Sequence, residues 1–132
     1  MKHLIRHIIL LCGLPLLLAG CMEWDYGDAV EDFNATGAGL FITNEGNFQY
    51  GNATLSYYDP ETQQVQNEVF FRANGMKLGD VAQSMCIHDN KGWVVVNNSH
   101  VIFAIDLNTF KEVGRIENLT SPRYIHFLSD EK

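Results

Sequence analysis

The sequence predicts an all-β protein, specifically a partial β-propeller, and three observations support this prediction. From Gly39 onward, short apolar strands alternate with polar turns, and no helical period is evident. The order of strands and turns then recurs further along the chain. The repeat has a period of roughly 40 to 50 residues with four strands in each unit, which is typical of a propeller blade. The alternative is a β-sandwich whose turns happen to resemble one another.

The first unit contains three expected strands, at residues 40–44, 53–58 and 64–71. The loop 45–52 separates the first two strands. The second strand ends in Asp59-Pro60-Glu61-Thr62, and proline directly after aspartate suits a type I turn.

The second unit repeats this order and adds a strand at its start. The four expected strands are residues 83–88, 93–97, 101–105 and 112–116. Asp106-Leu107-Asn108-Thr109 takes the place of the first aspartate turn. Residues 124–128 resemble the strand 83–88 and are expected to begin a third unit. The chain would thus contain about two blades: one that lacks its inner strand and one that is complete.

The first twenty residues have the charged, apolar and small-residue zones of a secretory signal. The apolar run 8–18 is too short for a spanning helix, which needs about 20 apolar residues. Ala19-Gly20 followed by Cys21 resembles the bacterial lipobox. We therefore expect residues 1–20 to be a lipoprotein signal peptide and Cys21 to be the acylated first residue of the mature protein. The alternative is an incidental thiol after a plain signal.

Residues 21–38 are interpreted as the acylated N-terminus and a flexible tether, because they are rich in acidic and small residues. Acyl chains on Cys21 would hold the propeller domain, residues 39–132, at a membrane. The acidic residues after Cys21 also resemble the surface-export signal of lipoproteins in Gram-negative gut anaerobes. We expect a lipid-anchored protein of the outer membrane, exposed on the cell surface.

The acidic composition, with a net charge of −7, argues against a nucleic-acid partner, because an acidic surface repels phosphate groups. Of the three cysteines, Cys12 lies in the signal and Cys21 is the predicted lipid acceptor. Cys86 remains, so no disulfide within one chain is expected.

A family resemblance is carried by residues 42–48, 55–60 and 78–85. These segments are similar to those of YncE-type (YVTN-repeat) β-propeller lipoproteins, and the similarity extends over residues 39–132. The resemblance implies a seven-bladed ring, of which this chain would be an N-terminal fragment. Some members, the BtuG-type proteins, bind vitamin B12 at the cell surface and pass it to a TonB-dependent transporter. The resemblance therefore implies a corrinoid ligand, although a propeller fold does not by itself determine a ligand.

Alternating strand direction sorts the loops onto two ends of the sheets. The aspartate-rich turns share one end, whereas the loops 45–52, 75–82, 97–100 and 119–123 share the other. These loops are longer and more aromatic, a mixture suited to a polar organic ligand. The candidate ligand-binding residues are Asn47, Phe48, Tyr50, Asp80, Gln83 and Arg123.

Each main candidate also has a structural interpretation. Phe48 and Tyr50 would in that case pack over the base of their own loop. Asp80 would cap a turn, and Arg123 would pair with a neighbouring blade.

No catalytic, cofactor or metal site is expected. The serines lack a Gly-x-Ser-x-Gly setting, and His88, His100 and His126 lie on separate strands and loops without zinc spacing. We therefore predict a binding protein rather than an enzyme. The competing function is a protein-interaction or structural module of the cell envelope that has no small-molecule ligand.

Overall fold

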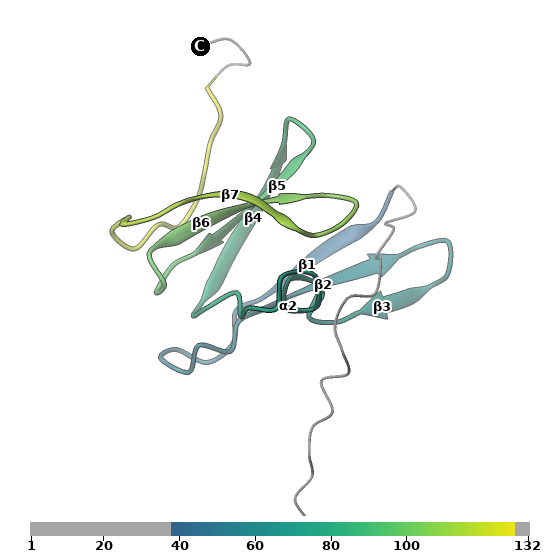
Figure 1. Cartoon of the computed structure of the whole chain (residues 1–132), viewed down its shortest axis with the longest axis horizontal. Helices are drawn as coiled ribbons and strands as arrows, with labels where there is room; N and C mark the ends of the chain where they lie inside the picture. The colour runs from purple at the N-terminus through teal and green to yellow at the C-terminus, as the bar shows by residue number, and fades with distance from the viewer. Residues whose placement is uncertain (1–37, 129–132) are drawn as a thin grey trace, which may run out of the picture.

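Two antiparallel β-sheets pack against each other in the computed structural model, which describes residues 38–128 (Figure 1). The predicted signal peptide, Cys21 and the tether up to residue 37 lie outside the described residues. The strands are β1 (Leu40–Asn44), β2 (Thr54–Asp59), β3 (Gln64–Gln66), β4 (Ala82–His88), β5 (Lys91–Val96), β6 (Val101–Asp106) and β7 (Glu112–Ile116). A short helix, α2 (Val69–Asn74), connects the two sheets. In the described part of the chain, no helix has the length and apolar character needed to cross a membrane.

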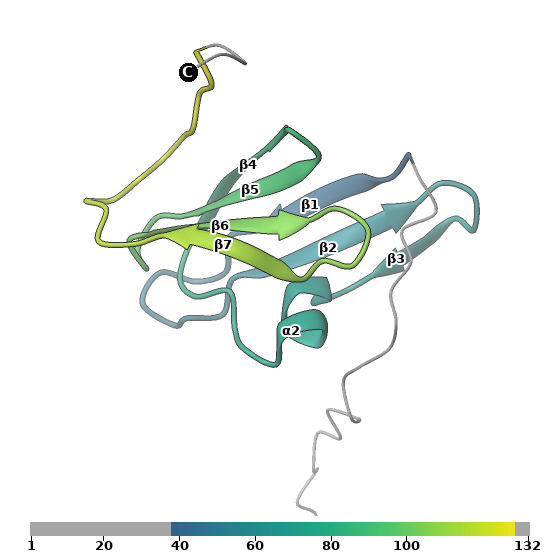
Figure 2. The same cartoon turned by 45° about the horizontal axis from the view of Figure 1, so that its top comes forward.

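Each sheet is a meander in which strands that follow one another in sequence also lie side by side. The first sheet has the order β1-β2-β3 and the second the order β4-β5-β6-β7 (Figure 2). This arrangement confirms the predicted all-β fold and fits one blade without its inner strand followed by a complete blade. Blades pack face to face about a common interior, as do the two sheets of a β-sandwich. Sandwiches of the immunoglobulin type, however, join their sheets by Greek-key connections, whereas here the first sheet is finished before the second begins.

The core lies between the two sheets because alternate side chains of each strand point toward it. Leu55 and Tyr57 of β2 face Phe103 and Ile105 of β6 within one buried apolar cluster. Phe110, in the turn after β6, contacts Tyr57 with a ring-centroid distance of 5.3 Å. Aromatic packing of this kind adds about 1 kcal/mol beyond the burial of apolar area.

The strand expected over residues 64–71 is wrong in its second half. It ends at Gln66, and the chain then turns into α2. Glu68 adopts the left-handed conformation, with φ of 55° and ψ of 32°, directly before the helix. Val69 and Phe70 are both fully buried, although they are adjacent in sequence. A strand would send neighbouring side chains to opposite faces, so a helical turn is needed to bury both in one core. Six residues are too few to show a helical period.

The expected inner strand over residues 124–128 is also wrong: no strand ladder includes them within the described residues. The segment instead lies against the face of the second sheet that points away from the shared core. The ring of Phe127 stacks on that of His88, with 3.8 Å between centroids, and contacts Trp93. A strand needs a neighbouring strand to satisfy its backbone groups, and no strand among residues 38–128 pairs with this segment.

The two aspartate turns are equivalent, as the repeat predicts. Asp59 Oδ1 accepts hydrogen bonds from the N–H groups of Glu61 and Thr62, at 2.8 and 3.4 Å. Asp106 Oδ1 accepts them from the N–H groups of Asn108 and Thr109, at 3.0 and 2.8 Å. An aspartate that bonds to the backbone shortly after itself is a common way to build a turn.

Candidate functional site

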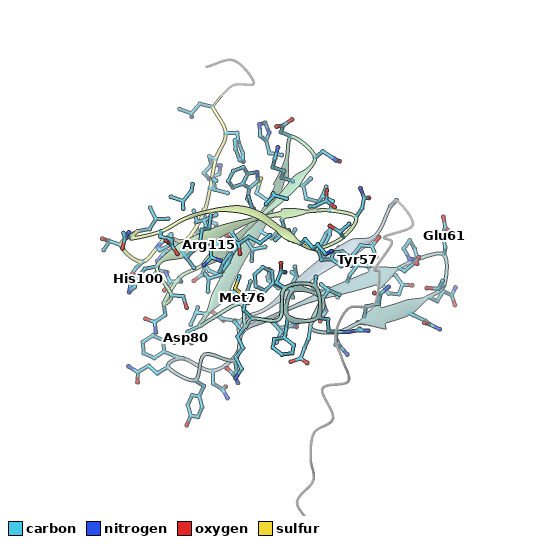
Figure 3. All side chains as sticks on the ribbon, in the orientation of Figure 1. Tyr57, Glu61, Met76, Asp80, His100 and Arg115 are labelled. Atoms are coloured by element: carbon cyan, nitrogen blue, oxygen red, sulfur yellow. The ribbon has the colours of Figure 1, made fainter. Side chains whose placement is uncertain are left out.

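Four connecting segments meet at one end of the two sheets, which we define as the loop end: residues 45–53, 75–81, 97–100 and 117–123. The aspartate turns lie at the opposite end, the turn end. Figure 3 shows Asp80 and His100 at the loop end and Glu61 at the turn end. The sorting of loops that the strand directions predict is therefore present in the structure.

Asp80 connects three of these segments. Its Oδ2 accepts hydrogen bonds from the N–H of Gln49, at 2.8 Å, and from Nδ2 of Asn98, at 2.5 Å. Its own N–H donates to Oγ of Ser99 at 2.8 Å. Asp80 is only 8% exposed, and its Oδ1 is buried with no hydrogen-bond partner among the described residues. Hydrogen bonds to a carboxylate are stronger than neutral ones, so this side chain holds the loops together rather than pointing into solvent.

Gly79, the preceding residue, allows the segments to approach closely. Its φ is 122°, which side chains rarely permit, and an added Cβ would lie 2.4 Å from Oγ of Ser99. The Gly79 carbonyl accepts a hydrogen bond from the N–H of Ala53 at 3.0 Å. The connection between α2 and β4 is thereby tied to both neighbouring loops.

Phe48 and Tyr50 are exposed on the loop that Asp80 holds. Their exposed fractions are 62% and 75%, so neither ring packs over the base of the loop. The loop is ordered by its own hydrogen bonds as well: Tyr50 N–H donates to the Asn47 carbonyl, and Asn47 N–H donates to Oδ1 of Asn52. Two large aromatic side chains are therefore presented to solvent on a fixed backbone.

Gln83 and Arg123 lie further from this loop. Gln83 is half-buried at an irregularity of β4, where the pairing with β5 shifts between Ala82 and Ser84. The side chain of Arg123 is exposed, and its carbonyl accepts a 2.7 Å hydrogen bond from Oγ of Ser84. Hydrogen bonds thus join the loop containing Asn47, Phe48 and Tyr50 to Asp80, but none in the described part of the chain joins it to Gln83 or Arg123.

Among the hollows that the described residues form, two open at the loop end. The first, of about 300 Å³, lies between the loop 45–53 and α2. Its lining includes Asn52, Ala53, Glu68, Phe71, Lys77 and Leu78. Glu68, Phe71 and Lys77 were not among the sequence candidates. The strand expected over residues 64–71 hid the first two, because it assigned them to a strand and the candidates were sought in the connecting loops.

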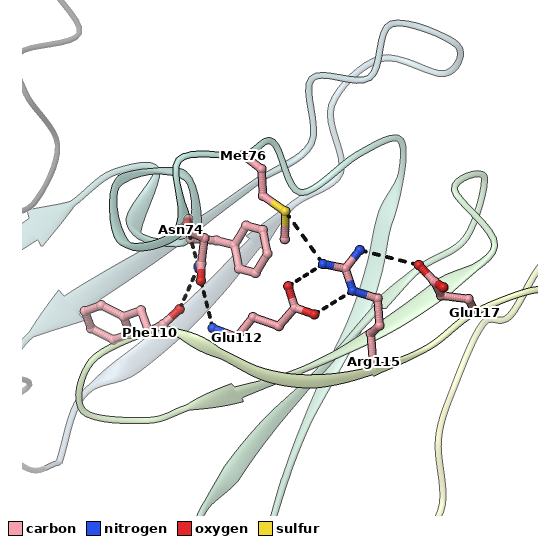
Figure 4. A network of polar contacts seen from close by, with 7 residues as sticks. Asn74, Met76, Phe110, Glu112, Arg115 and Glu117 are labelled. Atoms are coloured by element: carbon pink, nitrogen blue, oxygen red, sulfur yellow. Dashed lines mark hydrogen bonds and ion pairs between the residues drawn. The ribbon is translucent and has the colours of Figure 1, made fainter.

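The second hollow, of about 540 Å³, is lined by Lys77, His100 and Arg115, among others, and Arg115 is already engaged. Its guanidinium donates to both carboxylate oxygens of Glu112, at 2.5 Å, and to Glu117 at 3.4 Å (Figure 4). It also lies 4.9 Å from the ring centroid of Phe103. The Glu112 hydrogen bonds raise the pKa of Arg115 above its usual value. The contact with Phe103 joins β7 to β6, and together these contacts engage the Arg115 side chain within the fold.

Asn74 completes this network by fixing α2 to the turn after β6. Its Nδ2 donates to the carbonyls of Phe70 and Phe110, and its Oδ1 accepts from the N–H of Glu112 (Figure 4). The wall that α2 forms beside the first hollow is therefore fixed to the second sheet.

Comparison with known proteins assigns the domain to a family. A family described as a domain of unknown function (DUF5074) matches residues 38–131, a span that includes every strand and the helix described above. No curated protein matches the chain. Because the family match covers well over half of the sequence, the chain belongs to the DUF5074 family.

Proposed function

We propose that this protein is a cell-surface lipoprotein whose β-propeller domain binds a ligand at the loop end and delivers it to an outer-membrane transporter. The observation that carries the proposal is the exposure of Phe48 and Tyr50 on a loop that Asp80 fixes. Exposed aromatic rings on an ordered backbone bind apolar faces of a ligand at low entropic cost, because little of the site has to be immobilised on binding.

A corrinoid is the ligand we propose, on the basis of the resemblance to BtuG-type lipoproteins. Such a molecule combines a broad ring with polar amide arms, which suits aromatic side chains beside the polar Asn47 and Asn52. It is too large for the 300 Å³ hollow and would lie across the loop end, over Phe48 and Tyr50. A full propeller of seven blades, also part of this proposal, would add loops from further blades.

Titration of cobalamin into the purified protein, followed by calorimetry, tests this proposal. A Cys21→Ala variant supplies protein without the proposed anchor and should lose membrane association. In that background, Phe48→Ala together with Tyr50→Ala should weaken binding about thirtyfold, because two ring contacts contribute about 1 kcal/mol each. Val65→Ala and Val113→Ala, at exposed apolar positions of β3 and β7, should leave the affinity unchanged. If cobalamin does not bind to the protein in which Phe48 and Tyr50 are retained, the corrinoid proposal is refuted.

The second candidate is a protein-interaction module, and the free side of β1 favours it. Among residues 38–128, β1 pairs with β2 alone, and its Leu40 and Ile42 are exposed. An unpaired edge with apolar side chains readily accepts another strand. In the titration above, absence of binding by cobalamin would favour this candidate over ligand capture.

A further inference from the structure

We propose that the 300 Å³ hollow between the loop 45–53 and α2 binds a small zwitterion with an apolar body, such as an α-amino acid or a dipeptide. This inference concerns a site separate from the exposed aromatic pair and goes beyond the proposed function. It depends on the charges, the apolar lining and the fixed walls of the hollow.

Two opposite charges line this hollow without being paired. Glu68 and Lys77 both contribute to its wall. Within residues 38–128, neither side chain forms an ion pair or a hydrogen bond, whereas Lys91 and Arg115 each have a carboxylate partner. A ligand with an ammonium group for Glu68 and a carboxylate for Lys77 would satisfy both charges at once. Charge-assisted hydrogen bonds of this kind are stronger than neutral ones.

The remaining lining is apolar. Ala53 and Leu78 are buried, and Phe71 is half-buried beside them. Small-molecule sites combine such apolar walls with a few placed polar groups that orient the ligand. The volume lies at the lower end of the range for these sites, which begins at about 300 Å³. The hollow therefore suits a ligand with a short apolar side chain.

The walls of the hollow are fixed before any ligand arrives. The Ala53 N–H donates to the Gly79 carbonyl, which ties one wall to the segment that carries Lys77. The backbone of Glu68 is set in its left-handed conformation, and its carbonyl accepts the Arg72 N–H at 3.0 Å. Less ordering of the protein is then required when a ligand binds, which favours affinity.

Calorimetric titration of the full chain with leucine and with the dipeptide leucyl-leucine tests the proposal. At least one of them should bind. For leucine, N-acetyl-leucine lacks the ammonium group and leucinamide lacks the carboxylate, so each should bind at least tenfold more weakly; the blocked dipeptides serve in the same way for leucyl-leucine.

Substitutions of the two charged residues identify which group each recognises. Glu68→Gln should weaken binding of the zwitterion at least tenfold and leave the N-acetyl compound unaffected. Lys77→Gln should weaken zwitterion binding equally and leave the amide unaffected. Glu61→Gln and Lys111→Gln make the same changes of charge at the turn end and serve as matched controls. Urea unfolding of every variant separates loss of binding from loss of fold, and Lys77→Arg, which retains the charge, should retain binding.

Three results would overturn the proposal. The first is that neither zwitterion binds to the unsubstituted protein. The second is that the blocked analogues bind as tightly as the zwitterions, which would mean that only apolar contacts matter. The third is that the turn-end controls reduce affinity as much as Glu68→Gln and Lys77→Gln, which would indicate a general effect of protein charge.

Discussion

At the turn end, Asp59 and Asp106 bond to backbone groups two and three residues further along the chain, whereas at the loop end Asp80 bonds to groups 31 and 18 residues away. Aspartate side chains thus stabilise local turns at one end and connect segments distant in sequence at the other. At the turn end, each of the two aspartates stabilises its own hairpin. The loop end is a single assembly, in which a change at one residue affects loops from both sheets.

The comparison indicates that the loop end is better suited to a ligand site than the turn end. Local turns present mostly their own backbone to solvent. An assembly of loops encloses hollows and holds exposed aromatic side chains in fixed positions, as it does with Phe48 and Tyr50. Binding residues are commonly found on loops that a rigid scaffold positions, and only the loop end meets that description among the residues of the structure.

The largest effect on stability is expected from Gly79→Ala at the loop end. The φ of 122° and the contact of the new Cβ with Ser99 should together lower the free energy of unfolding by about 3 kcal/mol. Gly114→Ala in β7 is the matched control, because its added Cβ would meet nothing within 4 Å. It should raise stability slightly, by less than about 1 kcal/mol. Urea denaturation measures both values, and equal losses would show that the loop end is no more constrained than β7.

A smaller loss is expected from Asp80→Ala, about 2 kcal/mol, because it leaves the Gln49 N–H and the Asn98 amide without their acceptor. Asp80→Asn retains an acceptor oxygen and should lose less than half as much. Hydrogen exchange gives a more direct reading, since the Gln49 amide should exchange faster in the alanine variant. Unchanged protection of that amide would show that Asp80 does not organise the loop.

The smallest effect is expected at the turn end, from Asp106→Asn. Its neutral amide is a weaker acceptor than the carboxylate for the Thr109 and Asn108 N–H groups, so we expect a loss of about 1 kcal/mol at pH 7. The loss should be purely local, with no change in the exchange of the Gln49 amide.

The pH dependence of this difference provides a further check. The hydrogen bond from the Thr109 N–H, with smaller contributions from the Thr109 hydroxyl and Asn108, lowers the pKa of Asp106 in the folded protein. A carboxylate with a lowered folded pKa stabilises the fold above its unfolded pKa, about 3.9, and that contribution is lost as the pH falls through the folded value. The native protein should therefore exceed Asp106→Asn in free energy of unfolding by the full amount at neutral pH. This difference should disappear as the pH falls below about 4. A gap that stays constant from pH 7 to pH 2 would contradict this assignment.

The turn end was predictable from the sequence because its interactions are local. The turns at Asp59-Pro60 and Asp106 are predicted by the aspartate itself and by the residues within three positions after it. The strands were predictable for a similar reason, since a short apolar run bounded by turn residues is also a local signal. The direction of successive strands then sufficed to place Phe48, Tyr50 and Asp80 at one end.

The contacts within the loop end were not predictable, because their partners are distant in sequence. Nothing near Asp80 indicates that its carboxylate bonds to Gln49 and Asn98. The helix α2 was missed because Glu68 takes a left-handed conformation that glutamate rarely adopts, and the hollow beside Lys77 was missed with it. Exposure of Phe48 and Tyr50 likewise depends on how the whole loop is held. The sequence therefore could not decide whether the two rings pack over the base of the loop or are exposed to solvent.

The last strand of each sheet, β3 and β7, affects how readily this protein would self-associate at high concentration. β3 is only three residues long, because α2 takes over directly after it, and β7 is interrupted by a shift in its pairing with β6 between Ala104 and Ile105. Short or irregular edge strands are poor templates for intermolecular sheet growth. By shortening β3, the helix that replaces half of the expected strand therefore also makes the β3 edge a poor template for growth into fibrils.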